Sequence, residues 1–409
     1  MKRGLKEKKP ELLVGTGDFV SAIAAVKNGA DAVYFGVKGF NMRDLGTNFK
    51  AGELKKLMAF LHKNKVKGYL ALNTIVFDKE LKKAESLLKK AKQAKVDAAI
   101  ISDLGVLNLA KKHGLIPFLS TQASVSNLMA LKEYKKMGIK RIILARELSL
   151  KQIAKIKKEA KGMEIECFVH GAMCISVSGR CFLSHEVFGT SANRGKCLQP
   201  CRRAFFLDGV PPNYKEKDVL LQGNLLLSPK DLKVIEFLDK IISTKVDSVK
   251  IEGRNKPAHY VAVTTKCYRE AIDSIADKTF TKAKIASWNK QLETVFNRGF
   301  SNGFFFSTPG ARDLAKKQGS RQTQKRKQVG IVTNFYAKAM VAEVKLIERL
   351  SKNDKLLFQG ENTFFEQIAS SMQINHKDVS KVAKGRFVGI KVAERVRKND
   401  RVFLLKKQK

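Results

Sequence analysis

Acidic residues are scarce in this chain of 409 residues, and long apolar runs are missing. No stretch reaches the length of about 18 apolar residues that a membrane-spanning helix needs, so we expect no membrane segment. The basic residues 1–10 are not followed by the apolar core of a secretory signal. We therefore expect a cytoplasmic protein, in which cysteines serve more often as metal ligands or catalysts than in disulfides.

Motifs of common peptidases are also missing. The chain has no Gly-x-Ser-x-Gly elbow around a nucleophilic serine and no His-Glu-x-x-His zinc motif. Proteolysis therefore has no specific motif to support it.

The shortage of acidic residues leaves a large positive charge. Lysine and arginine number 79 against 38 aspartates and glutamates, a net charge of +41. Such a surface attracts polyanions, of which nucleic acid is the commonest in the cytosol. A source in which most proteins are lysine-rich is the alternative explanation. Many of the lysines are spread along expected helix faces, so the charge indicates a class of partner without locating a site.

The first 252 residues alternate short β-branched runs with segments of helical period, which is typical of βα units. Amphipathic segments such as 19–28, 51–63, 79–94 and 150–160 separate the runs. Eight such units predict a (β/α)8 barrel of the TIM type, with an open, doubly wound sheet as the alternative. The expected strands are 11–14, 32–35, 68–72, 98–102, 117–120, 141–145, 164–170 and 247–251.

Beyond the barrel we expect a change of structure. The barrel domain is predicted to span 1–310, with an insertion at about 171–230, and a basic linker to span 311–327. Residues 328–409 alternate like short strands and predict a small all-β barrel. Small barrels of this kind bind RNA or partner proteins, or serve only as a cap.

Polar residues follow the ends of the expected strands, where a barrel places its active site. Glycines there are explained by turns, but several larger side chains are less expected from turn chemistry. We predict that most of them line a pocket: Asn73, Gln122, Arg146, Glu147, His170, Glu252 and Arg254.

Four of the six cysteines lie in the insertion, at Cys174, Cys181, Cys197 and Cys201. Structural zinc sites favour two tight pairs, and only the second pair is tight, so the spacing favours an iron–sulfur cluster over zinc. Nearby glycines would let the backbone approach inorganic sulfur closely. Cys167 and Cys267 fit better as core thiols.

Charged residues interleave with these cysteines. Arg180, Arg194, Arg202 and Arg203 could balance an anionic cluster, or could bind phosphate or carboxylate. His170, at the end of the seventh expected strand, could act as a general base or lie beside the cluster.

Residues 166–184, ECFVHGAMCISVSGRCFLS, resemble the motif of peptidase family U32, the collagenase-like proteins. The resemblance extends over nearly the whole chain from residue 11. Supporting stretches are 32–36, 120–122, 146–149, 193–197 and 250–254.

The resemblance implies a (β/α) barrel, often with a small C-terminal β-domain. Several members of the family act in oxygen-independent hydroxylation and contain a 4Fe–4S cluster. One branch forms 5-hydroxyuridine at the wobble position of tRNA and uses prephenate, and this chain is most similar to that branch in length and in keeping its four cysteines in one insertion. Other branches hydroxylate a cytidine of 23S rRNA or the ubiquinone ring.

The resemblance therefore implies a tRNA hydroxylase, with tRNA and a small carboxylate as partners. Cys174, Cys181, Cys197 and Cys201 would hold the cluster, and Arg146, Arg180 and Arg254 would hold the acid. Glu147 or Glu252 would move protons. A U32-type peptidase, the other two hydroxylations and a non-catalytic RNA-binding factor are the alternatives.

Overall fold

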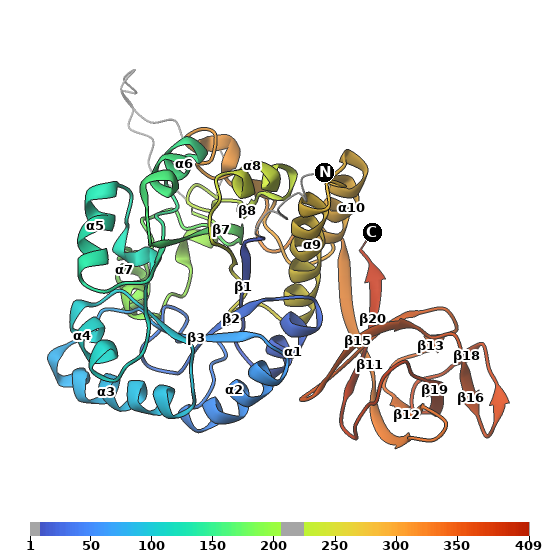
Figure 1. Ribbon diagram of the computed structural model, residues 1–409. Helices are drawn as coiled ribbons and strands as arrows, with labels where there is room; N and C mark the ends of the chain where they lie inside the picture. The colour runs from blue at the N-terminus through green and yellow to red at the C-terminus, as the bar shows by residue number, and fades with distance from the viewer. Residues whose placement is uncertain (1–8, 206–224, 409) are drawn as a thin grey trace, which may run out of the picture.

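The computed structural model describes residues 9–205 and 225–408 and contains a barrel followed by an all-β domain (Figure 1). Part of the expected insertion, 206–224, lies outside the described residues. The strands of the barrel are β1 (Glu11–Gly15), β2 (Ala32–Gly36), β3 (Lys67–Leu72), β4 (Ala98–Ile101), β5 (Pro117–Leu119), β6 (Arg141–Ile143), β7 (Glu164–Gly171) and β9 (Ser248–Ile251).

These eight strands confirm the predicted (β/α)8 barrel. Each is parallel to its neighbours, and β9 pairs with both β1 and β7, which closes the sheet and excludes the open alternative. The helices that cover it are α1 (Phe19–Lys27), α2 (Leu54–Lys63), α3 (Asp78–Gln93), α4 (Leu104–Lys112), α5 (Leu128–Lys136), α6 (Leu150–Glu159), α8 (Leu238–Ser243), α9 (Ala258–Ala276) and α10 (Lys282–Leu292).

The helices form where apolar residues recur every three or four positions, and a polar residue caps the start of several of them. Asp18 accepts the backbone N–H of Ser21 at 2.7 Å and begins α1. Asp103, Asn127 and Ser149 cap α4, α5 and α6 in the same way. The apolar face of each helix packs on the outside of the strands. None of the helices in the described ranges is both long enough and apolar enough to cross a membrane.

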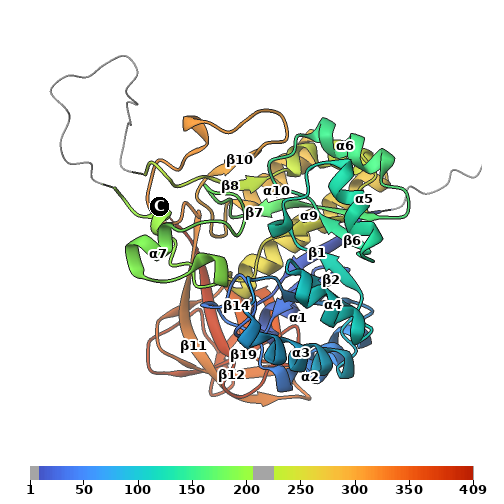
Figure 2. The same ribbon diagram turned by 90° about the vertical axis from the view of Figure 1, so that its left-hand side faces the viewer.

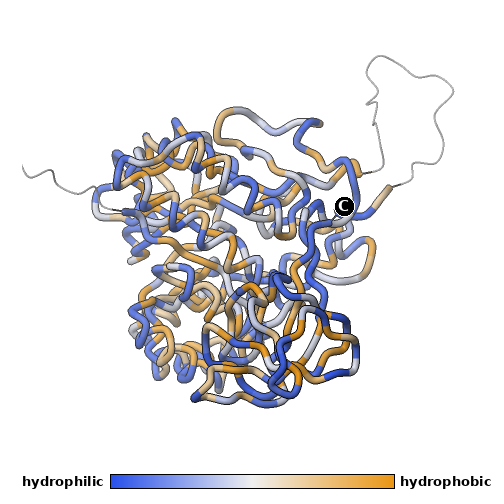
Figure 3. The backbone as a smooth tube through the Cα atoms, turned by 90° about the vertical axis from the view of Figure 1, so that its right-hand side faces the viewer, coloured by the Kyte–Doolittle hydropathy of each residue, from blue (hydrophilic) through white to orange (hydrophobic). Residues whose placement is uncertain are grey.

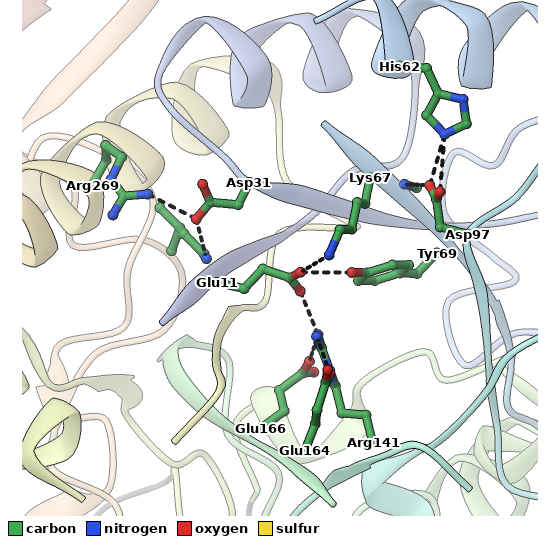
Figure 4. A network of polar contacts seen from close by, with 12 residues as sticks. Glu11, Asp31, His62, Lys67, Tyr69, Asp97, Arg141, Glu164, Glu166 and Arg269 are labelled. Atoms are coloured by element: carbon green, nitrogen blue, oxygen red, sulfur yellow. Dashed lines mark hydrogen bonds and ion pairs between the residues drawn. The ribbon is translucent and has the colours of Figure 1, made fainter. Parts of the chain in front are cut away.

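Charged side chains occupy the interior at the N-terminal end of the barrel (Figure 4). Arg141 Nη1 lies 3.1 Å from Glu166 Oε2, and Lys250 Nζ lies 3.0 Å from Glu166 Oε1. Tyr69 donates to Glu11 Oε2 at 2.9 Å, which extends the network to β1 and β3. Because these groups satisfy one another, this end of the barrel is closed, and the C-terminal ends of the strands remain for chemistry.

Two short strands were not predicted. In β8 (Asp231–Lys233), Leu232 and Lys233 pair antiparallel with the end of β7, and β10 (Phe300–Ser301) pairs with β8. They extend the sheet beside the connection between β7 and β9.

The C-terminal domain is all-β, as predicted. Its main antiparallel sheet has the order β15-β14-β20-β11-β12-β19-β16-β17 around its own apolar core. The strands are β11 (Gln324–Tyr336), β12 (Val341–Leu346), β14 (Lys355–Gly360), β15 (Thr363–Ile368), β16 (Met372–Ile374), β17 (Lys377–Asp378), β19 (Phe387–Lys391) and β20 (Arg401–Lys407), with β13 (Leu350–Ser351) and β18 (Lys381–Val382) forming a separate pair.

Most of the expected basic linker, 311–327, is exposed, and its beginning packs against the barrel domain. Ala315 is buried, and its N–H donates to Ser228 O at 2.7 Å, because residues 311–315 pack against the segment before β8. Strand β11 begins at Gln324, within the expected linker. The domain then packs beside α1, and Lys56 Nζ on α2 lies 2.6 Å from Glu361 Oε1.

Candidate active site at the barrel mouth

A cavity of about 140 Å³ opens at the C-terminal ends of the barrel strands, beneath the cysteine-bearing insertion. In Figure 2 this insertion, with its short helix α7 (Leu183–Phe188), lies to the left of the barrel strands. The cavity wall contains all four insertion cysteines together with residues from several βα loops. A second cavity of about 60 Å³ continues into the barrel and shares Met42, Arg43, Thr121, Gln122, Phe168 and Glu252 with the first.

 All four insertion cysteines line this cavity. Although 26 residues lie between Cys174 and Cys201 along the chain, the fold of the insertion brings both thiols to the same cavity. Cys174 is exposed, and the other three thiols are half-buried. Burial raises the pKa of Cys197 and of Cys201 above the ordinary value of a thiol. No group of three or more His, Cys, Asp or Glu side chains in 9–205 and 225–408 is arranged to hold a single metal ion.

Cys167 and Cys267 lie elsewhere, as predicted. Both are buried in the apolar core of the barrel domain, and burial raises the pKa of each thiol to about 12. These two thiols are structural and do not face the cavity.

The insertion is held against the barrel mouth by polar contacts and close backbone packing. Arg194 forms a two-point ion pair with Glu80 of α3, with Nη1 2.9 Å from Oε2. Asn193 Oδ1 accepts the backbone N–H of Cys181 at 2.8 Å. Gly195 has a φ of +83°, and a Cβ there would lie 2.0 Å from Asn41 O, so only glycine fits this contact.

Glu252, at the end of β9, is the carboxylate that lines both cavities. It is 5% exposed, and its Oε1 lies 3.4 Å from Arg43 Nε. Burial alone would raise the pKa of Glu252, but Arg43, Lys256, Arg146 and Arg254 together lower it below its ordinary value. The carboxylate is therefore ionised at neutral pH although it is buried.

Two arginines at the mouth, Arg146 and Arg254, have buried N–H donors without a hydrogen-bond acceptor among the described residues. Arg146 Nη1 donates to Ala172 O at 2.8 Å, and its guanidinium lies 4.5 Å from the centre of the Phe168 ring. Its buried Nε and Nη2, and the buried Nε of Arg254, have no hydrogen-bond partner among the described residues. Burial lowers the pKa of Arg146, and it lowers that of Arg254 to about 10. An anion in the cavities would supply the missing acceptors.

Asn73 and Gln122 lie side by side in the inner cavity. Asn73 Nδ2 donates to Gln122 Oε1 at 3.2 Å and to Ser120 Oγ at 3.0 Å. Asn73 Oδ1 accepts the backbone N–H of Met42 at 3.3 Å. These contacts fix the two amides at the wall, where they could hydrogen-bond a polar ligand.

Three residues expected at the site lie outside both cavities. Glu147 and Arg180 are exposed and line neither cavity. His170 is 1% exposed and packs against Tyr260, Tyr268 and Phe300, and burial lowers its pKa to about 3. The structure therefore gives His170 a packing role, since a neutral imidazole enclosed by aromatic rings cannot reach a substrate in the cavity.

Sequence reasoning missed Arg43, Tyr34 and Lys250, which also line the inner cavity. Arg43 belongs to the long loop between β2 and α2. The length of that loop was the sequence feature that could have indicated a functional segment. Lys250 lies within β9, with its Nζ 4.1 Å from the centre of the Tyr34 ring. A lysine inside a β-branched run was the signal for an inward-facing charge.

Curated proteins similar to this chain carry names of two kinds. An uncharacterized protease of Methanocaldococcus jannaschii is 44% identical over 97% of this chain and 98% of its own length. A collagenase of Porphyromonas gingivalis is 34% identical over 97% of this chain and 98% of its own length. A protein of Bacillus subtilis named tRNA hydroxylation protein P1 is 34% identical over 86% of this chain and 84% of its own length.

The family comparison covers the barrel and the insertion together. Residues 17–315 match peptidase family U32, a range that contains the four cysteines and every residue of the two cavities described above. With this match and with relatives that align over nearly the whole chain, the protein belongs to peptidase family U32.

Proposed function

We propose that this protein hydroxylates an RNA base without molecular oxygen, and that the base is the wobble uridine of a tRNA. The observation that carries the proposal is the shared cavity, in which four cysteines face a buried, ionised carboxylate and an arginine with unpaired donors. The similarity to a relative named for tRNA hydroxylation supports it.

We propose that the cysteine wall holds a 4Fe–4S cluster rather than zinc. Cys174, Cys181, Cys197 and Cys201 line one cavity, yet no three of the described ligand side chains are arranged to hold a single ion. A cubane is larger than an ion and its corners point apart, so its thiolates need not converge on one point. Arg43, Arg146 and Arg202 lie close enough to the thiols to offset negative charge. When bound, a cluster would supply electron transfer at the mouth.

A small carboxylate would fit the other wall of the cavities. Arg146 and Arg254 offer three buried donors without partners, and arginine binds carboxylates through paired N–H groups. Prephenate, which the family resemblance suggests as co-substrate, carries two carboxylates and could use both arginines. Asn73 and Gln122 would then orient its remaining polar groups.

Glu252 is the candidate proton carrier. It lies in both cavities, and the surrounding cations keep it ionised, so it can accept a proton from a bound group at neutral pH. Hydroxylation replaces the C5–H bond of uridine with C5–OH, a two-electron oxidation of the base. With water as the source of the oxygen atom, the step releases two electrons and two protons, so it needs an electron acceptor as well as a base.

RNA is the substrate class that the charge favours. The net charge of +41 would attract a phosphate backbone, and the bases of a single-stranded loop can leave the stack and enter a pocket. A cytidine of 23S rRNA would satisfy the same argument, so the identity of the modified nucleoside decides between the two RNAs.

Peptidase activity is the alternative that two relatives' names favour. Neither cavity wall includes a histidine, so the described residues offer no imidazole base for a serine or cysteine nucleophile there. These two cavities therefore give no specific support for a serine- or cysteine-type peptidase.

Two measurements test the proposal. Anaerobic purification followed by an absorbance scan and analysis of iron and sulfide should give a brown protein with both elements, and a colourless protein that contains zinc would exclude the cluster. Mass spectrometry of tRNA nucleosides from a deletion strain should then show loss of 5-hydroxyuridine. Unchanged 5-hydroxyuridine would exclude the proposed substrate.

A further inference from the structure

A groove of about 770 Å³ lies between the barrel and the C-terminal domain. One wall consists of Pro257, His259, Tyr260 and residues 294–296 of the barrel. The other consists of the beginning of β11 and the end of β20, which extend from the C-terminal domain toward α9 and α10 (Figure 1). The same stretch near the C-terminus is hydrophilic in Figure 3.

The wall formed by β11 and β20 is strongly basic. It contributes five cationic side chains to the groove, and no aspartate or glutamate belongs to the described lining: the five are Lys325, Arg326, Lys327, Lys406 and Lys407. Lys327 pairs with Glu348 at 2.8 Å, and Arg326 donates to Gln359 while it stacks on Phe403. No carboxylate of the described chain forms an ion pair with Lys325, Lys406 or Lys407.

The strand register places like charges opposite each other. Lys325 is the direct partner of Lys406 across the antiparallel pair, and both side chains are exposed. Like charges directly opposite on neighbouring strands destabilise a sheet. An external polyanion would relieve this repulsion, whereas an apolar partner would bury unpaired lysines at high cost.

The groove also lies next to the candidate active site. Asn255 lines the cavity with the four cysteines, and Pro257, two residues later, lines the groove. Lys256 between them places its Nζ 3.5 Å from the centre of the Phe296 ring. A chain bound along the groove would therefore lead toward the barrel mouth.

We propose that this groove binds the sugar-phosphate backbone of the RNA substrate, away from the base that enters the mouth. The inference rests on the proposed function for the identity of the polyanion. Lys325, Lys406 and Lys407 contact phosphates as point charges, and β11 and β20 provide the rigid support that holds them.

The test measures binding of an unmodified tRNA transcript to the anaerobically purified full chain across a range of salt concentrations. Replacing Lys325, Lys406 and Lys407 with alanine should weaken binding about tenfold or more and reduce the slope of log K against log salt by about 2 to 3. The matched control replaces Lys151, Lys155 and Lys158, three exposed lysines of α6, and removes the same charge. The control should change affinity by less than about threefold, and the corresponding triple arginine variant of the groove should retain binding.

Equal weakening in the groove and α6 variants would overturn the proposal, because it would show a general effect of charge. Groove-dependent binding of polyglutamate as tight as that of tRNA would overturn RNA as the partner. Nucleoside analysis separates this test from that of the proposed function. If the nucleoside product is normal and the groove variant binds tRNA as tightly as the unaltered chain, only the groove proposal is rejected. If tRNA binding depends on the groove but no modified nucleoside is formed, only the proposed hydroxylation is rejected.

Discussion

Arg43 Nε lies 3.4 Å from Glu252 Oε1 and joins the loop after β2 to the end of β9 inside the barrel mouth. The Glu252 side chain is 6% exposed and that of Arg43 is 29% exposed, so the carboxylate is the deeper partner. This contact helps to keep Glu252 ionised against the effect of burial, which would raise its pKa. The pair therefore helps to keep the carboxylate ionised at neutral pH, as its proposed role requires.

Replacing Glu252 with glutamine should abolish most product formation. The amide keeps the shape of the side chain but cannot accept a proton, and loss of a general base typically costs a factor of about 10² to 10⁴ in rate. Glu147→Gln is the matched control, since Glu147 is exposed outside both cavities. Nucleoside mass spectrometry measures the product, and circular dichroism checks the fold. Equal loss in the two variants would contradict the assignment of Glu252.

Arg146→Lys should weaken binding of the carboxylate co-substrate more than it slows turnover. A lysine keeps the charge but loses the planar pair of N–H donors, so KM for the acid should rise about tenfold or more. The exposed Arg180, which lines neither cavity, should tolerate the same change with little effect. Steady-state kinetics at varied prephenate concentration gives both constants. An unchanged KM for Arg146→Lys would remove this arginine from the acid site.

Single serine variants of the four insertion cysteines should lose iron. Each removes one proposed ligand, so iron per chain and visible absorbance should fall after anaerobic purification, and product should fall with them. Cys267→Ser is the control because this thiol is buried in the core away from the cavity. The Cys267→Ser protein should keep its iron even if its folded state is less stable. Full iron content in a Cys174→Ser variant would contradict the proposed ligand set.

Folding stability should decrease as the solution becomes more acidic than about pH 6.5. Burial lowers the pKa of His170 to about 3, from an ordinary value of 6.5. Between these values the unfolded chain binds a proton that the folded chain does not, so this group reduces the free energy of unfolding by up to about 1.4 kcal/mol per pH unit as the pH falls. Urea unfolding at several pH values should show a smaller slope for His170→Phe than for the unaltered chain. Identical slopes would show that His170 titrates normally.

The barrel could be predicted because its strands are buried on both faces. Runs of apolar residues such as 32–35 and 98–101 mark such strands, and helical periodicity marks the segments between them. Strands β8 and β10 could not be predicted, since two or three residues carry no pattern of their own. They form because the end of β7 offers free backbone groups to β8.

The site was predictable only in part, for a geometric reason. Polar residues at strand ends correctly marked Asn73, Gln122 and Glu252 as cavity residues. Consecutive residues at the end of a strand, however, place their side chains on opposite sides. Arg146 therefore faces the cavity, whereas Glu147 faces solvent. Sequence position alone could not distinguish the two. Arg43 was missed because it reaches the mouth from the middle of a loop, where no periodicity applies.

The closure of the barrel has a consequence for maturation of the protein. The pairing of β7 with β9 completes the sheet, and none of the four insertion cysteines takes part in it. The strand pairing that closes the barrel therefore involves none of the proposed cluster ligands. Assembly of the proposed cluster would then be a late step on a preformed scaffold, at a mouth where Cys174 is exposed.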